Sequence, residues 1–406
     1  MSTTTLPLPP LKRDATVIGL VGLAHCISHF SQLLLPPLFP WLRDAFQVSY
    51  AQLGFLLTIF FVVSCVVQAL AGFVVDRFGP RPVLFGGIGL LGIAALGYAG
   101  SRSYWMLAGF AVIAGIGNGV FHPVDYTLIN RRVAKPRLGH AYSVHGITGS
   151  LGWALAPVLL VPVAMAASWR VALLVAAALA FGVLALLWLW RGELQVAPLH
   201  PAVQGHAAEH SLAFLRIPAV LMCLAFFLFN AGALSIVQTF APQAARELHA
   251  VPQSLVALCL TVYMLCSAGG MVIGGFLAHD PARAERIVGI AYGCAAAVAL
   301  IVGFASLPPL AVPVLFGAMG VASGLAGPSR DLLVKSAAPD NATGRVYGVV
   351  YAGLDIGQAL MPLGVGTLMD RGAYGSVWLV LALVQGVLIV SAFNVRRARR
   401  RALQPA

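Results

Sequence analysis

The stretch GFVVDRFGPRPVL, residues 72–84, decides the fold of this chain, because it is a short charged turn between two long apolar segments. Two glycines suit such a turn: Gly72 would allow close helix approach, and Gly79 would allow the chain to reverse tightly. The acid and the bases of the turn can bind neighbouring helix ends. These charged residues are Asp76, Arg77 and Arg81.

The segments around this turn are typical of the whole chain, which has 406 residues, 60% of them hydrophobic and only 9% charged. A membrane-spanning helix needs about 20 mostly apolar residues, and segments of this kind recur along the full length. The sequence therefore predicts an all-α membrane protein without a large soluble domain. We predict twelve spans, at residues 15–36, 50–74, 82–100, 104–130, 139–164, 170–190, 217–241, 252–278, 286–307, 311–335, 345–369 and 374–395.

The net charge of +12 could indicate a nucleic-acid partner, but the positions of the charges argue against one. With these spans, 19 of the 25 lysines and arginines fall on one side of the membrane and five on the other. Cytoplasmic loops carry such an excess, so we expect both termini in the cytoplasm. The tail RRARRR, residues 396–401, is expected to contact anionic membrane lipid.

The chain also repeats itself. Residues 119–157 align with residues 324–362 at a constant offset of 205, and LRDAFQV from Leu42 resembles ARELHAV from Ala245 at an offset of 203. We therefore predict a six-helix bundle over residues 1–190, a cytoplasmic linker over 191–216, and a second six-helix bundle with the basic tail over 217–406. Two such repeats are the plan of transporters whose halves rock about a site at mid-membrane.

The turn of residues 72–84 resembles the G-x-x-x-D-R-x-G-x-R-x-x-L loop of the major facilitator superfamily. The resemblance implies a secondary transporter with a small-molecule substrate and a gating loop of Gly72, Asp76, Arg77, Gly79 and Arg81 that holds the outward-facing state. The corresponding loop of the second half, GGFLAHDPARAERI, has His279 where the aspartate is expected. We expect a monomer in the bacterial inner membrane, without a cofactor.

Three further stretches, FHPVDYTLI, AYSVHGITGSLGWALAP and GPSRDLLV, resemble the fosmidomycin-resistance-like and drug-efflux branches of this superfamily. The resemblance implies efflux by proton antiport. Span five resembles the antiporter signature, a series of glycines that ends in Gly-Pro, but departs from it because Ala156 replaces the glycine before Pro157. Span four likewise has Ala111 where many members carry an arginine.

Ionisable residues inside spans are expensive and usually mark a cavity, a partner or a proton route. His122 and Asp125 are three residues apart on span four, and His145 is expected at the same depth on span five. Our first hypothesis makes Asp125 the proton-coupling carboxylate, assisted by His122 or His145. A static Asp125–arginine pair that holds helix packing is the alternative, and His122 alone could be a packing histidine.

Other polar groups are expected to contact substrate. Arg330 lies deep in a span and would attract an anionic group, or would have Asp355 or Asp125 as a structural counter-ion. Asn230 stands at the repeat position of His25, and Gln358 suits a cavity wall. These groups of the two halves could form one belt around the interface between the halves.

His25 and His29 share one face of span one, at positions i and i+4. They could pack or line a cavity, contact substrate, or bind a metal ion. Together with His122 and Asp125 they would offer nitrogen and oxygen ligands to a divalent transition metal. Metal transport is therefore the main alternative to export of a small organic compound.

Several other classes are excluded or disfavoured. The chain has no GxxxxGK[ST] loop, so ATP does not supply the energy. HCISH, residues 25–29, lacks the glutamate of the zinc-protease motif HExxH, and we do not expect an enzyme. A sensor that has kept the fold but does not transport is a further alternative.

Overall fold

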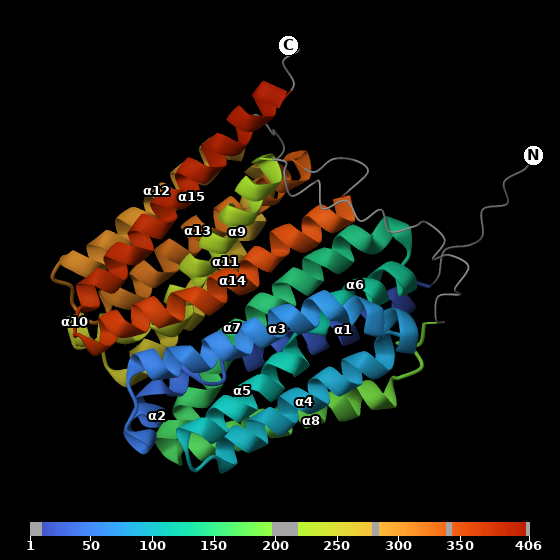
Figure 1. The fold of residues 1–406 in the computed structure, drawn as a ribbon, viewed down its shortest axis with the longest axis horizontal. Helices are drawn as coiled ribbons and strands as arrows, with labels where there is room; N and C mark the ends of the chain where they lie inside the picture. The colour runs from blue at the N-terminus through green and yellow to red at the C-terminus, as the bar shows by residue number, and fades with distance from the viewer. Residues whose placement is uncertain (1–9, 197–217, 278–283, 338–342, 403–406) are drawn as a thin grey trace, which may run out of the picture.

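The computed structural model describes residues 10–196, 218–277, 284–337 and 343–402, and the regular structure in these residues is helical (Figure 1). Among them, ten helices are long and apolar enough to cross a membrane, or eleven when two helices bent by 49° are counted as one span. A further 28-residue helix, α14, packs against α3 and α9. These helices make up the predicted twelve-span plan.

The helices form two bundles of six spans each. The first bundle consists of α1 (Leu11–Gln32), α2 (Phe39–Phe46), α3 (Tyr50–Phe78), α4 (Pro80–Gly100), α5 (Tyr104–Asn118), α6 (Phe121–Arg132), α7 (Leu138–Ala166) and α8 (Trp169–Leu189). The second consists of α9 (Pro218–Thr239), α10 (Ala241–His249), α11 (Gln253–Leu277), α12 (Ala284–Phe304), α13 (Ala311–Ala337), α14 (Thr343–Asp370) and α15 (Tyr374–Ala402). Most of the predicted linker lies outside the described residues.

The short helices α2 and α10 show that the internal repeat is structural. Both lie at the same end of the molecule (Figure 1). Each ends at a residue in the left-handed region, Gln47 with φ 51° and Ala250 with φ 50°, at the offset of 203 seen in the sequence. A non-glycine residue rarely adopts this conformation, so its recurrence at equivalent positions is a specific sign of common design.

Glycines at equivalent positions bring equivalent helices into contact. A Cβ atom at Gly115 or Gly119 would collide with the backbone of α3, and one at Gly320 or Gly324 would collide with the backbone of α11. The glycines of IAGIGNG, residues 113–119, thus allow close helix packing. The same packing is built twice, once in each bundle.

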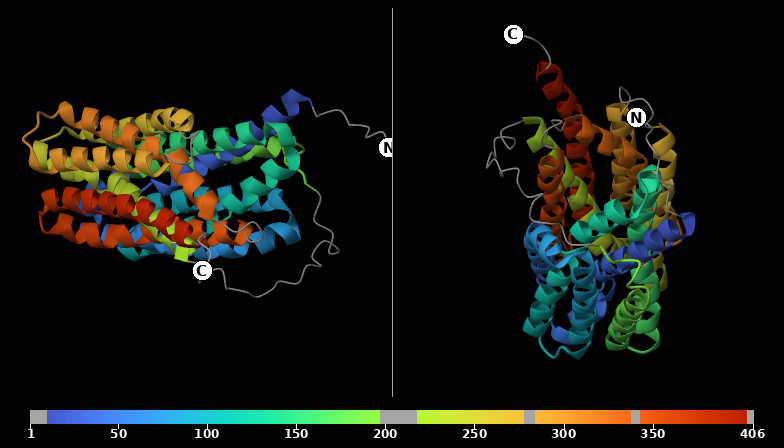
Figure 2. Two further views of the ribbon diagram at one scale, coloured as in Figure 1. Left: turned by 90° about the horizontal axis from the view of Figure 1, so that it is seen from above. Right: turned by 90° about the vertical axis from the view of Figure 1, so that its right-hand side faces the viewer.

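The two halves meet along α3 with α14 and along α7 with α11 (Figure 2). The carboxylate of Asp370 accepts hydrogen bonds from the backbone N–H groups of Tyr50 and Ala51, at 2.6 and 2.9 Å, and so caps the start of α3. Farther along α3, the Thr58 hydroxyl donates to the backbone oxygen of Ala359 at 2.6 Å. Charge at a helix start and polar contacts to backbone groups therefore hold the halves together at the end that carries α2 and α10.

Span four covers the predicted range, as the single candidate span Tyr104–Arg132. Its helix is interrupted between α5 and α6, at Gly119 and Val120, although both residues keep right-handed helical backbone angles. Pro123 explains the break, because proline has no N–H to donate and its ring clashes with the carbonyl four residues earlier, that of Gly119. Pro328 stands at the repeat position, but α13 continues through it.

We predict that Gly357→Ala lowers the melting temperature of the purified protein. Its Cβ would collide with the backbone of Leu228 and Gly232 on α9, and overpacking of this kind typically costs about 1–3 kcal/mol. Gly364→Ala on the same helix is the matched control, because a Cβ there meets nothing within 4 Å. Equal melting temperatures for the two variants would show that α9 and α14 are not packed in this way.

Candidate functional site

A pair of histidines on α1 forms one wall of the candidate site. The rings of His25 and His29 lie 4.2 Å apart, and both residues are buried, as i and i+4 positions on one helix face allow. His29 also stacks on the indole of Trp153 from α7, with ring centroids 4.2 Å apart. The aromatic contact fixes the direction of the His29 ring.

The break in span four supplies the second wall. Because α6 starts anew at Phe121, His122 and Asp125 fall in its first two turns. Asp125 is completely buried, at 0% exposure, and His122 is partly buried.

Asp125 joins three helices. Its Oδ2 atom lies 3.0 Å from His25 Nδ1 on α1 and 3.0 Å from His145 Nε2 on α7. The two imidazole rings stack on each other at 3.6 Å. The other oxygen, Oδ1, is buried and has no hydrogen-bond partner among the residues that the structure describes. A buried carboxylate is very costly without partners, so the two histidines are what allow Asp125 to lie there.

A network of neutral polar groups supports this cluster. The Oδ1 atom of Asn118 accepts hydrogen bonds from Ser28 at 2.9 Å and from Gln32 at 3.2 Å, while its Nδ2 donates to Ser64 at 2.8 Å. Trp153 donates to Gln32 at 2.9 Å. The network ties α1, α3, α5 and α7 together directly beside the histidines, so their rings are held by a rigid frame.

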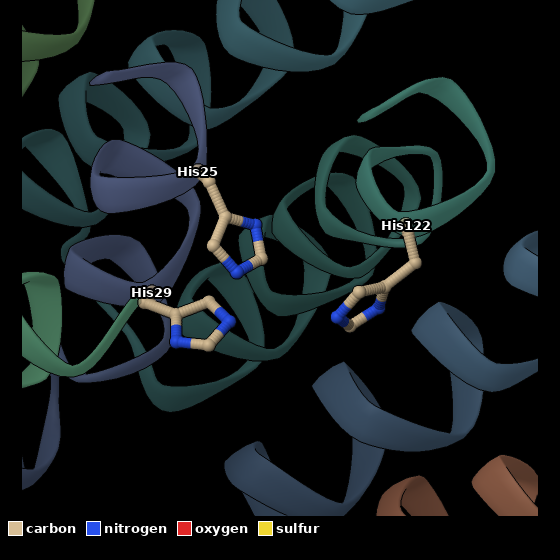
Figure 3. A group of neighbouring side chains, drawn as sticks. All are labelled: His25, His29 and His122. Carbon is tan, nitrogen blue, oxygen red and sulfur yellow. The ribbon is translucent and has the colours of Figure 1, made fainter. Parts of the chain in front are cut away.

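The side chains of the histidine cluster and Asp125 are suited to bind a metal ion. The ligand atoms of His25, His29 and His122 all lie within 4.8 Å of one another, and so do those of His25, Asp125 and His145. Figure 3 shows the first three rings turned toward one another. Imidazole and carboxylate ligands favour zinc, copper, iron and nickel over calcium or magnesium.

The predicted substrate residues of the second half lie apart from this cluster. Asn230 accepts a hydrogen bond from the Tyr292 hydroxyl at 2.6 Å, and Gln358 donates to Gln238 at 3.1 Å. Asp355 accepts from Gln68 of α3 at 3.1 Å. Arg330 belongs to α13, but its side chain lies outside the described residues.

The titratable cluster therefore lies within the first bundle. His25, His29, His122, Asp125 and His145 all come from α1, α6 and α7 of the first bundle. Asp355 approaches the cluster from the second half, through Gln68. A belt of polar groups from both halves stays a prediction, because the side chains of Arg330 and Asp331 lie outside the described residues.

The predicted gating loop is a tight turn in this conformation. Gly79 has φ 82°, which only glycine adopts readily, and α4 begins directly after it. Asp76 and Arg77 are exposed. Among the described residues, a Cβ at Gly72 would meet nothing within 4 Å, so the close helix approach expected there stays a prediction. His279 and its loop lie outside the described residues.

Some polar residues of the site and its surroundings were not singled out by the sequence. Gln68 and Trp153 lie on long apolar helices, and only their polarity could have marked them. Asp14, at the start of α1, is completely buried and accepts a hydrogen bond from Arg137 at 2.6 Å. This ion pair connects α1 to the turn before α7. The sequence has several basic loops, and nothing in their pattern indicates that Asp14 would pair with Arg137.

Ten or eleven candidate spans and the long helix α14 among the described residues, arranged in two repeated bundles around a buried polar cluster, are the plan of a secondary transporter. The model of the Major Facilitator Superfamily matches residues 21–362, and the chain belongs to this family. The fold is similar to that of a bacterial homologue of the human lysosomal transporter Spinster in an inward-facing, occupied conformation. The TM-score is 0.79 at 14% identity, over 98% of this chain and 100% of that one.

Two curated relatives resemble parts of the sequence. The fosmidomycin resistance protein of Escherichia coli is 30% identical over 147 residues, which cover 35% of this chain and 35% of that protein. The uncharacterized transporter YfnC of Bacillus subtilis is 26% identical over 305 residues, which cover 74% of this chain and 73% of that protein. The first match thus spans about a third of the relative's length.

We predict that Gly149→Ala impairs transport while the protein stays folded. Gly149 faces the histidine pair, and its new Cβ would lie 2.8 Å from the His29 ring and 3.0 Å from His25 Nε2. The rings would have to turn away from Asp125 and Trp153. Gly146→Ala is the control, because a Cβ there meets nothing within 4 Å. Flux into proteoliposomes and melting temperature are measured together, and equal flux in both variants would contradict the assigned site.

Proposed function

We propose that the protein exports a small organic compound in exchange for protons, across the bacterial inner membrane, with both termini in the cytoplasm. The observation that carries the proposal is the Asp125 carboxylate, which lies between His25 and His145 and has no exposed surface. The described hydrogen-bond partners of Asp125 are thus titratable groups, which supports its use as a proton site.

The arrangement provides a physical route from proton binding to cargo release. A carboxylate that accepts two imidazole N–H groups holds both rings in place, and charge-assisted bonds of this kind are about twice as strong as neutral ones. A proton on Asp125 would weaken both bonds and release the rings that face the cargo. Antiport follows when the protonated and the cargo-bound states exclude each other.

Two further observations support export and the proposed orientation. The relative from Escherichia coli is named for resistance to fosmidomycin, a property that efflux would provide. The basic residues gather in alternate loops, as expected of cytoplasmic loops. The gating loop around Asp76 would then lie on the cytoplasmic side and would engage when that side closes.

We predict that Asp125→Asn abolishes uphill transport driven by a pH gradient in proteoliposomes and leaves downhill exchange of cargo measurable. Asparagine keeps the shape of the side chain but cannot exchange a proton. Asp44→Asn is the control, because Asp44 is exposed on α2 and far from the cluster in the chain. Uphill transport by Asp125→Asn with an unchanged pH dependence would rule out the proposed coupling site.

A second candidate function is transport of a divalent transition metal. Its support is the convergence of His25, His29 and His122, whose ligand atoms lie within 4.8 Å of one another. The Nδ1 atoms of His25 and His122 already bond to Asp125 and Gln68, so the Nε2 atoms are left for a ligand. Metal-binding histidines are commonly held by such a partner on their other nitrogen.

If a metal is the cargo, the purified protein will bind Co²⁺, Ni²⁺ or Zn²⁺, and His29→Ala will weaken the binding at least about tenfold. His140→Ala is the control, because His140 is exposed and lies outside the cluster. Isothermal titration gives the affinities, and the visible spectrum of bound Co²⁺ reports its coordination. Equal binding by the two variants would contradict a site at these histidines and leave export of an organic compound as the proposal.

A further inference from the structure

A chain of hydrogen bonds connects the histidine cluster of the first half to the second half of the protein. The Oε1 atom of Gln68, on α3, lies 2.8 Å from His122 Nδ1. The Nε2 atom of the same side chain donates to Asp355 Oδ2, on α14, at 3.1 Å. Gln68 therefore stands between a member of the cluster and a carboxylate of the other bundle.

We propose that Asp355 is a second proton-binding carboxylate of the transporter and that Gln68 links its protonation state to His122. This inference rests on the proposed function, proton-coupled transport, and adds a site in the second half. In this proposal Asp355 senses protons, a role beyond that of a counter-ion or a substrate contact. Gln68 is a positioning residue, because it acts only through the groups at its two ends.

The link follows from the chemistry of an amide, which has an acceptor at one end and donors at the other. With the amide nitrogen toward an ionised Asp355, its oxygen faces His122, which must donate from Nδ1. The reverse orientation requires a proton on Asp355 and an acceptor at His122 Nδ1. The two orientations of Gln68 thus correspond to two arrangements of protons in the two halves.

The position of this link relates it to the movement of the halves. Of the hydrogen bonds described between α3 and α14, the one from Gln68 to Asp355 lies farthest along α3 from its start at Tyr50. The contacts nearer that start use backbone groups of Tyr50, Ala51 and Ala359, which do not touch the cluster. Since a bond to an ionised carboxylate is stronger than one to a neutral acid, a proton on Asp355 would loosen α3 from α14 at the depth of the site.

The titratable groups near the two ends of the Gln68 link come from the helices that pack around Asp355 and around His122. Near Asp355, α3 contributes Cys65. The sequence of α9 contains no acid or base apart from Cys223, and the charged residues of α15 begin at Arg396, whose side chain is outside the described residues. On the side of His122, the titratable neighbours are His25, His29, Asp125, Tyr126 and His145. Among the described salt bridges, none involves Asp355.

The test measures the separation of the halves as a function of pH, without cargo and without a pH gradient. Spectroscopic probes are attached through unnatural amino acids at Lys135 and Arg286, which are exposed and lie on opposite halves, so that the native cysteines remain. In the wild type we expect the distance distribution to change across a single titration. In Asp355→Asn this titration should disappear.

Gln68→Leu should move the midpoint of the titration to higher pH by about one unit, because the ionised Asp355 loses a donor that stabilises it. Thr58→Val is the matched control: it removes another hydrogen bond between α3 and α14 and should change the distances without moving the midpoint. A midpoint unchanged in both Gln68→Leu and Asp355→Asn would overturn the inference. The proposed function is tested separately: uphill transport by Asp125→Asn would contradict it and would not by itself contradict the role of Asp355.

Discussion

The rest of this structure depends on one constraint: a carboxylate inside a membrane protein must find donors within the protein. Asp125 satisfies it with two imidazoles on one oxygen. To bring those imidazoles together, α1, α6 and α7 must approach closely at this depth, and the approach needs small residues. Gly149 and Gly152 on α7 face His25, His29 and the backbone of α1 without a side chain between them. The glycines that allow α7 to pack closely on α1 therefore also bring the imidazoles within hydrogen-bonding distance of Asp125.

The sequence predicted the fold well because the fold depends on patterns that the chain displays directly. Hydrophobic length predicts spans, and the offset of 205 predicts two bundles, which the recurring left-handed residues Gln47 and Ala250 reflect in the backbone. The sequence also grouped the histidines of the first bundle with Asp125, but it did not predict which atoms bond to which. Hydropathy does not determine the rotation of a helix about its axis, so the pairing of Asp125 with His25 and His145 followed only from packing.

The break in span four shows where prediction from the sequence stopped. The stretch GNGVFHP contains both a proline and the glycines that tolerate a break, and yet Pro328, at the equivalent position, lies within a continuous helix. A proline permits a break but does not require one. The close contact of Gly119 with Ser64 on α3 does not explain the difference, because Gly324 makes the equivalent contact with Ser267 on α11. The interruption lies directly before His122 and Asp125, which fall in the first two turns of α6.

The two halves share a backbone plan but not a chemistry. At the position equivalent to His25, the second half has Asn230, which bonds to Tyr292 and brings no charge. A symmetric pair of titratable clusters would place twice as many ionisable groups in the membrane, each requiring partners. The clustered histidines all belong to the first half, and Gln68 and Asp355 connect them to the second half by hydrogen bonds. Under the proposed link, this connection is what would let the second half respond to the protonation state of the cluster.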